Sequence, residues 1–234
     1  GLIGKPIPTT WKCAMTCCTK RGFRWSSFFR SSESKPDATL TPLGNIHHLA
    51  LRCRDAEQTR WFYEDVLGLK LSAALSLEQA PGTGQDRPFL HLFLALGDGN
   101  YIAFFDDPTQ ARPEHFELKD SYDIHIAFET DSRESMLAWK DKIAAAGDFI
   151  FGPIDHDFVE SVYFYDPNGY ALEITHKTAN HDTVLRDEER SAREHIAAWT
   201  ARTRAQKVEI FGASAIDARC SALPAPSASK MTRK

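Results

Sequence analysis

Two histidines at corresponding places in the sequence, together with one glutamate, have side chains that can bind a metal. His48 and His125 each open a short apolar segment, 48-HLALRCRD-55 and 125-HIAFETDS-132. Glu173 lies within the apolar run 171-ALEI-174, where an unpaired buried carboxylate would be costly. Two imidazoles and one carboxylate on one face leave about three positions of an octahedral ion open, as in non-haem Fe(II) oxygenases. These residues predict a divalent metal site. The alternative is that both histidines are structural and that Glu173 forms a salt bridge.

A repeated order of strands and one helix would position these residues. In the first half, a strand at Ile46–Cys53 is followed by a helix over Ala56–Val66, with Asp55 as its N-cap and Gly68 just beyond its end. Three further strands are expected at Leu69–Leu77, Phe89–Leu96 and Tyr101–Phe105. The Gly- and Pro-rich segment 80–88 is expected to be a loop between the first two of them.

The second half repeats this order. A strand at Asp123–Thr130 precedes a helix that starts after Asp131 or Ser132 and runs to about Ala146. The remaining strands are expected at Phe149–Ile154, Ser161–Tyr165 and Tyr170–Thr175. The sequence therefore predicts an α+β fold, in which two tandem βαβββ modules form a curved mixed sheet around a metal pocket.

These modules, at residues 45–107 and 122–177, make up one predicted domain over 45–178. A C-terminal helix is expected over residues 180–207. Its apolar residues share one stripe that would dock on the core or on a partner subunit: Leu185, Ala192, Ile196 and Trp199.

The two ends of the chain differ from the domain in composition. Residues 1–44 are rich in Ser, Thr, Lys and Arg, and they are expected to be a disordered or targeting extension. Residues 208–234 are expected to be a flexible tail.

Charge and cysteine usage limit the partners and the compartment. The net charge is −4, yet residues 1–32 carry six basic and no acidic side chains, so the middle of the chain is acidic and a poor nucleic-acid surface. No apolar run is long enough to span a membrane. Five cysteines without a regular framework indicate a reducing compartment. A cytoplasmic location is therefore expected, with a mitochondrial one as the alternative because the N-terminus is basic.

Three short motifs accompany these elements: 48-HLALRCRD-55 before the first helix, 62-FYEDVLG-68 at its end, and 166-DPNGYALE-173 near the end of the second module. Together they resemble the vicinal oxygen chelate superfamily over about residues 45–177. That superfamily includes glyoxalase I, fosfomycin and bleomycin resistance proteins, methylmalonyl-CoA epimerase and the extradiol ring-cleaving dioxygenases. The resemblance is specific for the superfamily but does not select the reaction.

Ala103 separates the branches of this superfamily. Superimposing the modules on Ile102 and Leu172 places Ala103 opposite Glu173. Glyoxalase I and the epimerases commonly have a fourth ligand, Glu or Gln, at this position, whereas extradiol dioxygenases have a non-ligand there. Extradiol enzymes also carry a tyrosine ten residues before the glutamate, here Tyr163, whose phenol would hydrogen-bond a metal-bound catecholate. The resemblance is therefore closest to the extradiol dioxygenases and implies Fe(II), with Mn, Ni or Zn as alternatives.

One position departs from the extradiol pattern. The acid/base histidine of two-domain extradiol enzymes would fall near Asn100, and an asparagine cannot relay a proton. His156, seven residues before Tyr163, and His91, which has pocket-side parity on its strand, are the candidates to replace it. Each also has a purely structural alternative.

The expected function is that of a non-haem Fe(II) oxidoreductase, a dioxygenase that acts with O2 on a catechol-like or other bidentate oxygen substrate. One alternative is a glyoxalase-like lyase or isomerase that acts through a metal-bound enediolate. Another is an antibiotic-binding resistance protein, which the retention of three metal ligands disfavours. The expected partner is a small molecule rather than a nucleic acid or a membrane. A homodimer, by analogy with the family, and a single chain that closes its own pocket both remain open.

Overall fold

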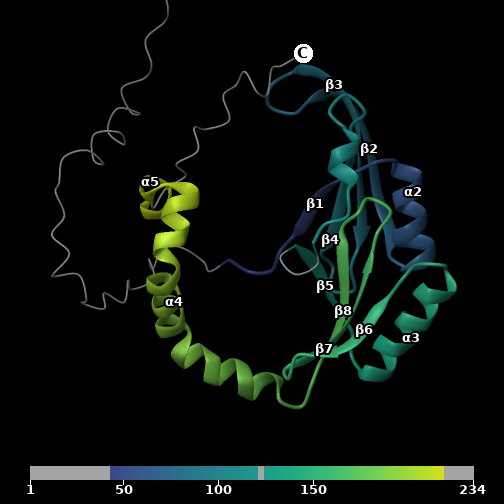
Figure 1. Ribbon diagram of the computed structural model, residues 1–234. Coiled ribbons are helices and arrows are strands. Elements are labelled where there is room, and N and C mark those ends of the chain that lie inside the picture. Colours follow the sequence, from purple (N-terminus) through teal and green to yellow (C-terminus); the bar gives the residue numbers. More distant parts are fainter. Residues whose placement is uncertain (1–42, 121–123, 219–234) are drawn as a thin grey trace, which may run out of the picture. The chain divides into compact units, whose positions relative to one another are not determined.

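The structure is a computed structural model that describes residues 43–120 and 124–218. The chain divides into two units after Gly44, and the second unit, Asn45–Lys234, contains both modules. The predicted α+β class with two tandem βαβββ modules is confirmed, and each module builds its own four-stranded mixed sheet (Figure 1). The predicted extension over residues 1–44 lies almost entirely outside the described residues.

The first module forms a sheet with the strand order β1-β4-β3-β2. Its strands are β1 (His48–Cys53), β2 (Lys70–Ala80), β3 (Gln85–Ala95) and β4 (Tyr101–Asp106). The edge strand β1 runs parallel to β4, and the other neighbours are antiparallel. The Gly- and Pro-rich segment 80–88 is shorter as a loop than expected, because the long β2–β3 hairpin extends into it from both sides and leaves only residues 81–84 as the turn.

The helix of the first module changes type along its length. It begins as α2 (Ala56–Arg60), with the Asp55 side chain accepting a hydrogen bond from the Gln58 N–H, as an N-cap should. It then continues as a π-helix (Trp61–Val66), so the expected single α-helix is only half α-helical. The wider turn carries the adjacent Phe62 and Tyr63 into the core, where both are buried.

The second module repeats the sheet with the order β5-β8-β7-β6. Its elements are β5 (His125–Glu129), α3 (Arg133–Ala145), β6 (Phe151–Asp155), β7 (Val159–Tyr165) and β8 (Ala171–Lys177). Ser132 caps α3 through a hydrogen bond from the Ser135 N–H. A short 3-10 helix, Pro113–Phe116, lies in the connection between the modules.

The register of the two sheets confirms the internal alignment of the repeat. In the first sheet Ala103 of β4 is opposite Phe93 of β3, and in the second Glu173 of β8 is opposite Tyr163 of β7. Ala103 also pairs with the third residue of β1, as Glu173 pairs with the third residue of β5. Ala103 is therefore the structural counterpart of Glu173.

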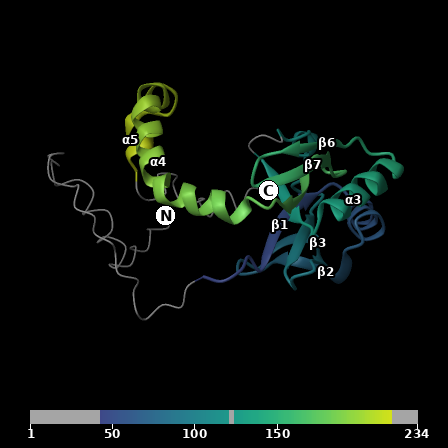
Figure 2. The ribbon, with the colours of Figure 1, turned by 90° about the horizontal axis from the view of Figure 1, so that it is seen from below.

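The core lies on the helical side of both sheets. Figure 1 and Figure 2 show α2 and α3 on the same side of the strands. Strand alternation directs one set of side chains from each sheet toward these helices. The largest fully buried members of this core are Tyr63, Phe62, Phe104, Phe164, Leu92, Leu94, Ile102, Met136, Ile143, Leu172 and Val162. Burial of such a side chain contributes about 1.5–3 kcal/mol, so the helix-facing surfaces hold the two modules together.

The C-terminal helix is longer than predicted. α4 runs from His181 to Phe211, and α5 (Ala213–Asp217) extends the helical structure into the segment expected to be a tail. No residue of α4 is buried, and Leu185, Ile196 and Trp199 are each more than two-fifths exposed. The predicted apolar stripe is thus present, but it is not buried on the core.

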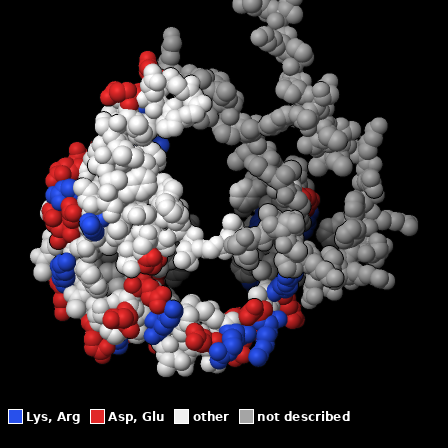
Figure 3. Space-filling view, turned by 180° about the vertical axis from the view of Figure 1, so that it is seen from behind, with Lys and Arg blue, Asp and Glu red and all other residues white. Residues whose placement is uncertain are grey.

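Charge on the described surface is mixed. Figure 3 shows basic and acidic side chains interspersed on one face rather than separated into regions of one sign. Among the described residues, no helix is long and apolar enough to cross a membrane.

Candidate functional site

His125 and Glu173 form the centre of the candidate site. Parallel pairing of β5 with β8 places Ala127 opposite Glu173, so that His125, two residues earlier, projects from the same face. The His125 Nε2 atom lies 3.1 Å from the Glu173 Oε2 atom. The Glu173 side chain is only 7% exposed, whereas that of His125 is 34% exposed. A nearly buried carboxylate is therefore held beside an imidazole that solvent or a ligand can reach.

Tyr163 and His156 border this pair. Tyr163 lies opposite Glu173 in the β7–β8 register, and its ring centroid is 6.1 Å from that of His125. Burial raises the pKa of the Tyr163 phenol, and the nearby Glu173 carboxylate raises it further. His156 follows β6, and its Nε2 atom lies 3.0 Å from the phenol oxygen. Four predicted site residues thus form one contiguous cluster on the second module.

His48 occupies the equivalent position on the first module. It opens the edge strand β1, where the His48 side chain is exposed. Its Nδ1 atom lies 2.9 Å from the Nδ1 atom of His47, and its ring meets Phe93 edge-on at a centroid distance of 5.8 Å. The side chain is accessible, and His47 and Phe93 are its neighbours within the part of the chain that the structure describes.

His91 lies on the same sheet as His48. Its ring stacks on Phe105 with centroids 3.7 Å apart and lies 4.3 Å from Phe93. The His91 Nδ1 atom is 2.9 Å from the backbone oxygen of Phe104. Because a carbonyl oxygen only accepts, the Nδ1 atom must carry a proton and donate it to this bond.

The six predicted site residues therefore fall into two groups. The group on the second module contains His125, Glu173, Tyr163 and His156, and the group on the first sheet contains His48 and His91. Within residues 43–120 and 124–218, no three His, Cys, Asp or Glu side chains are close enough to hold a metal ion. One chain thus brings together two of the three predicted ligands, and the complete triad stays a prediction.

One cavity in the described part of the chain includes no residue of either group, although it reaches Ala127 and Ile174 beside Glu173. It has a volume of about 650 Å³ and is lined by residues of both modules, among them Leu67, Leu96, Ala127 and Trp139. None of the predicted site residues lines it. The volume of this cavity therefore does not locate the candidate site, which is identified instead by the atoms that could bind a metal.

Asp166 and Asn168 organise the turn before β8 and connect it to the first module, a connection that the sequence did not reveal. The Asp166 carboxylate accepts hydrogen bonds from the backbone N–H groups of Asn168 and Tyr170 and from the Tyr63 hydroxyl. The Asn168 side-chain oxygen accepts from the Arg54 N–H at 2.8 Å. Both residues are buried, and burial raises the pKa of Asp166. The turn thereby fixes the start of the Glu173 strand against the first module.

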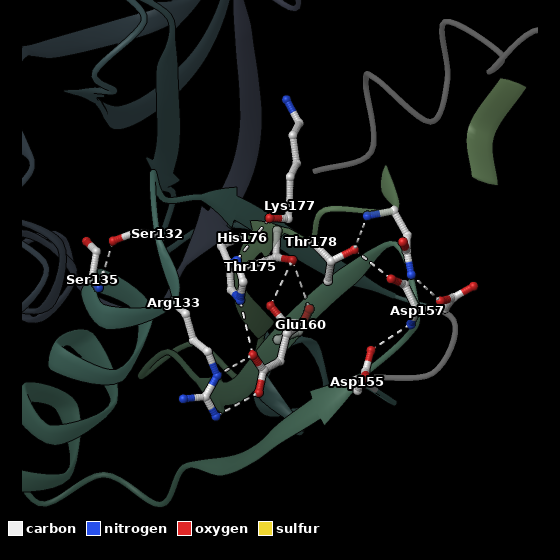
Figure 4. Close-up of polar contacts among 12 residues, drawn as sticks. Ser132, Arg133, Ser135, Asp155, Asp157, Glu160, Thr175, His176, Lys177 and Thr178 are labelled. Atoms are coloured by element: carbon white, nitrogen blue, oxygen red, sulfur yellow. Dashed lines mark hydrogen bonds and ion pairs between the residues drawn. The ribbon is translucent and has the colours of Figure 1, made fainter. Parts of the chain in front are cut away.

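Glu160 provides a second support behind the site. Figure 4 shows Arg133 and His176 converging on its carboxylate. The Arg133 Nε atom donates at 2.8 Å and the His176 Nε2 atom lies at 3.1 Å. Hydrogen bonds from Arg133 and then from His176 lower the pKa of Glu160. This network ties the start of α3 to β7 and β8, the strands that carry Tyr163 and Glu173.

Comparison with known proteins identifies the family. The model of the Glyoxalase/Bleomycin resistance protein/Dioxygenase superfamily matches residues 45–174, which covers both modules. The chain therefore belongs to this superfamily, and the resemblance to the vicinal oxygen chelate proteins is confirmed.

Individual relatives are distant. The chain is 26% identical over 140 residues to a lactoylglutathione lyase of Neisseria meningitidis, an alignment that covers 58% of this chain and 94% of that protein. A glyoxalase/dioxygenase of Nostoc punctiforme is 26% identical, with a TM-score of 0.45 and coverage of 62% and 99%. The fosfomycin resistance protein FosX of Listeria monocytogenes is 19% identical, with a TM-score of 0.44 and coverage of 60% and 98%.

Proposed function

We propose that the protein is a metal-dependent dioxygenase of the extradiol type that acts on a catechol-like substrate with two neighbouring oxygens. The observation that carries this proposal is the donor pair of His125 and Glu173, with the Tyr163–His156 pair beside it. The counterpart of Glu173 in the first module is Ala103, which has no donor atom. A set of two histidines and one carboxylate would leave positions for a bidentate substrate and a second reactant.

The donor atoms fit a divalent ion. Two metal–ligand bonds of about 2.1 Å that meet near a right angle place their donor atoms about 3 Å apart. The separation of His125 Nε2 and Glu173 Oε2 is 3.1 Å. When bound, the metal would supply Lewis-acid stabilisation of the substrate oxygens and a template for its reactants.

Tyr163 and His156 would move the substrate proton. A hydroxyl both accepts and donates, so a substrate O–H can donate to the Tyr163 oxygen while the Tyr163 O–H donates to His156 Nε2. The proton then reaches His156 without Tyr163 ever becoming a phenolate, in agreement with the raised pKa of Tyr163. His156 is therefore preferred over His91 as the base, because His156 already contacts Tyr163, whereas the His91 ring stacks on Phe105 and its Nδ1 atom bonds the Phe104 backbone oxygen.

The third ligand, His48, would come from a second copy of the chain. His48 opens an exposed edge strand, and its neighbours Ile46 and Leu49 are 76% and 40% exposed. Two copies related by a twofold axis would each offer His48 to the other's His125–Glu173 pair, which gives two equivalent sites in a homodimer.

A glyoxalase-like lyase or isomerase is the second candidate. The similarity to a lactoylglutathione lyase favours it. The absence of a donor at Ala103 counts against it, because the related enzymes commonly use a fourth protein ligand there.

The decisive experiment is oxygen uptake by protein loaded anaerobically with Fe(II), with a panel of catechols as substrates. We expect oxygen consumption that depends on both the metal and the catechol, with formation of a ring-cleaved product. Changing His156 to Gln should lower kcat by about 10²- to 10⁴-fold, the range for loss of a general base. Both His125→Ala and Glu173→Gln should abolish metal binding, whereas His195→Ala on exposed α4 is the matched control that should keep it.

The outcomes separate the candidates. Metal binding without oxygen uptake, together with isomerisation of a hemithioacetal under Ni(II) or Zn(II), would establish the lyase reading instead. Absence of divalent-metal binding in the unmodified protein would rule out both enzymes.

A further inference from the structure

A smaller cavity opens on the sheet that carries His48. It has a volume of about 330 Å³ and lies where the ends of β1 and β4 meet the β2–β3 hairpin. Its polar lining consists of two arginines and one aspartate, Arg52, Arg87 and Asp107, and two phenylalanines, Phe89 and Phe105, supply aromatic walls.

The charges in this cavity do not cancel. The Arg87 Nε atom donates to Asp107 Oδ2 at 2.6 Å, so these two charges neutralise each other. Burial acts to raise the pKa of Asp107, but hydrogen bonds from Thr109 and Arg87 outweigh it and the net shift is downward, which keeps the carboxylate ionised. The Arg52 guanidinium forms no hydrogen bond or ion pair with any residue that the structure describes. One positive charge is left for a ligand.

The walls suit a flat apolar group. The rings of Phe89 and Phe105 lie 5.5 Å apart at an angle of 56°. The Phe105 ring also stacks against the ring of His91, its other aromatic neighbour. An aromatic ring that entered the cavity would therefore continue an existing row of rings.

The cavity lies on the same face of the sheet as the predicted ligand. Strand side chains alternate, so His48 and Arg52, four residues apart on β1, project to one side. At about 3.3 Å per residue their Cα atoms are about 13 Å apart. Arg52 also pairs across the sheet with Phe105, and Phe105 pairs with His91. One substituted ring could lie between the two ends of β1.

We infer that this cavity is the subsite for a carboxylate carried by the substrate, so that the substrate class is catechol-like aromatic acids. The inference rests on the proposed function for the position of the reacting end. A single net positive charge matches a monoanion better than a phosphate dianion, and the planar guanidinium can grip a carboxylate with two parallel hydrogen bonds.

Binding of phenylacetate to metal-free protein tests the subsite without any turnover. We expect isothermal titration to show phenylacetate binding more tightly than phenylacetamide, its neutral counterpart. The variant Arg52→Gln should weaken phenylacetate binding by about tenfold to a hundredfold, since it removes a charge-assisted pair. Arg52→Lys keeps the positive charge but loses the planar guanidinium. Its affinity for phenylacetate should therefore lie between those of the unmodified protein and of Arg52→Gln. Arg186→Gln on exposed α4 is the control for loss of a positive charge elsewhere.

Several results would overturn the inference. Equal binding of the acid and the amide, or unchanged phenylacetate binding in a folded Arg52→Gln variant, would exclude a carboxylate subsite. Inorganic phosphate that displaces phenylacetate with equal potency would make the cavity a general anion site instead.

Oxygen uptake tests the proposed dioxygenase function separately from the carboxylate subsite. If the subsite is real and the enzyme is a dioxygenase, Arg52→Gln lowers the ratio of kcat/KM for carboxylated over unsubstituted catechol by at least about tenfold. Arg52-dependent phenylacetate binding without oxygen uptake would keep the subsite and reject the dioxygenase. Oxygen uptake with an unchanged kcat/KM ratio in Arg52→Gln would support the dioxygenase and reject the carboxylate subsite.

Discussion

His125 and Glu173 become a donor pair through a backbone register rather than through any property of their own. The parallel pairing of β5 with β8 fixes which residues face each other, and the position of β8 is set by the turn before it. That turn is closed by hydrogen bonds to Asp166 and ends at Gly169. Asp166 and Gly169, which are not proposed to bind metal or substrate, thus help to set the position of Glu173 relative to His125.

Gly169 is the residue in this turn that tolerates change least. Its φ of +82° is rarely adopted by other residues, and a Cβ atom there would lie 2.6 Å from the backbone oxygen of Glu117. We expect Gly169→Ala to lower the free energy of unfolding by more than about 2 kcal/mol, because strain and a backbone clash add. Urea denaturation measures this.

Gly99 is the matched control, since it occupies the same place in the turn of the first module. Its φ is +86°, but a Cβ atom there would meet nothing within 4 Å. Gly99→Ala should therefore cost only the conformational strain of about 1 kcal/mol. Equal losses in the two variants would show that the approach of Glu117 is not what requires glycine at position 169.

At the scale of elements, Glu160 joins one helix to two strands. It lies on β7, accepts from Arg133 at the start of α3, and meets His176 on β8. Since the side chains of Arg133 and His176 come from different elements, loss of Glu160 would loosen the strands that carry Tyr163 and Glu173.

The contribution of Glu160 to stability should depend on pH. Its folded pKa is lowered by Arg133 first and His176 second, so the stabilisation is present above the unfolded value of about 4.5 and is lost as the pH falls through the folded pKa. We expect Glu160→Gln to lower the free energy of unfolding by about 2 kcal/mol at neutral pH and by much less in acid. Urea denaturation of both proteins across the acidic range gives the difference.

The exposed Glu189 of α4 provides the control for that measurement. Glu189→Gln removes one carboxylate from an element without buried residues, so it should leave stability nearly unchanged at every pH. A Glu160→Gln effect that stayed constant into the acid range would contradict the assignment to an ionised carboxylate.

The expectation for α4 is answered only in part. Its apolar stripe predicts docking on the core or on a partner subunit, and the exposure of its large apolar side chains in the described chain leaves only the partner subunit. Helical periodicity establishes that one face is apolar, but it cannot say what covers that face.

At the scale of the whole molecule, the two modules are joined through their helix-facing surfaces. The Tyr63 hydroxyl of one module bonds Asp166 of the other, and the Phe62 and Phe164 rings lie 6.4 Å apart. The opposite faces, which carry His48 and the His125–Glu173 pair, are left without a common set of three ligands within the described residues. In the function proposed above, a second copy of the chain supplies the third ligand.

Subunit mixing tests this arrangement. His48→Ala and Glu173→Gln proteins should each lack metal-dependent activity alone. If the ligands come from two chains, unfolding and refolding the two variants together should restore about a quarter of wild-type activity, because half of the dimers are mixed and each mixed dimer has one intact site. Oxygen uptake and iron content per subunit are the readouts.

Sites built within one chain would give no recovery in that mixture, since every chain would still lack one ligand. A third mixture, of His125→Ala with Glu173→Gln, is the internal control. Both of these ligands belong to the same half of the site, so no mixed dimer should regain activity under either arrangement.

Much of the fold could be predicted because its determinants are local. The caps Asp55 and Ser132, the turn glycines and the alternation of apolar residues fixed the order and approximate limits of the elements. The correspondence of Ala103 with Glu173 also followed from the repeat, since equal spacing along strands produces equal register. The π-helix could not be predicted, because helical periodicity over so few residues does not distinguish it from an α-helix.

The sequence by itself identified the side chains that could carry chemistry and the strand that bears each one. Only the tertiary structure decided which of them meet. Strand parity decides which face of its own sheet each of His48, His125 and Glu173 occupies, but it contains no information on how one sheet is oriented toward the other. That orientation results from burial of apolar side chains on the helical sides, a non-directional force that joined the modules there and separated His48 from the His125–Glu173 pair.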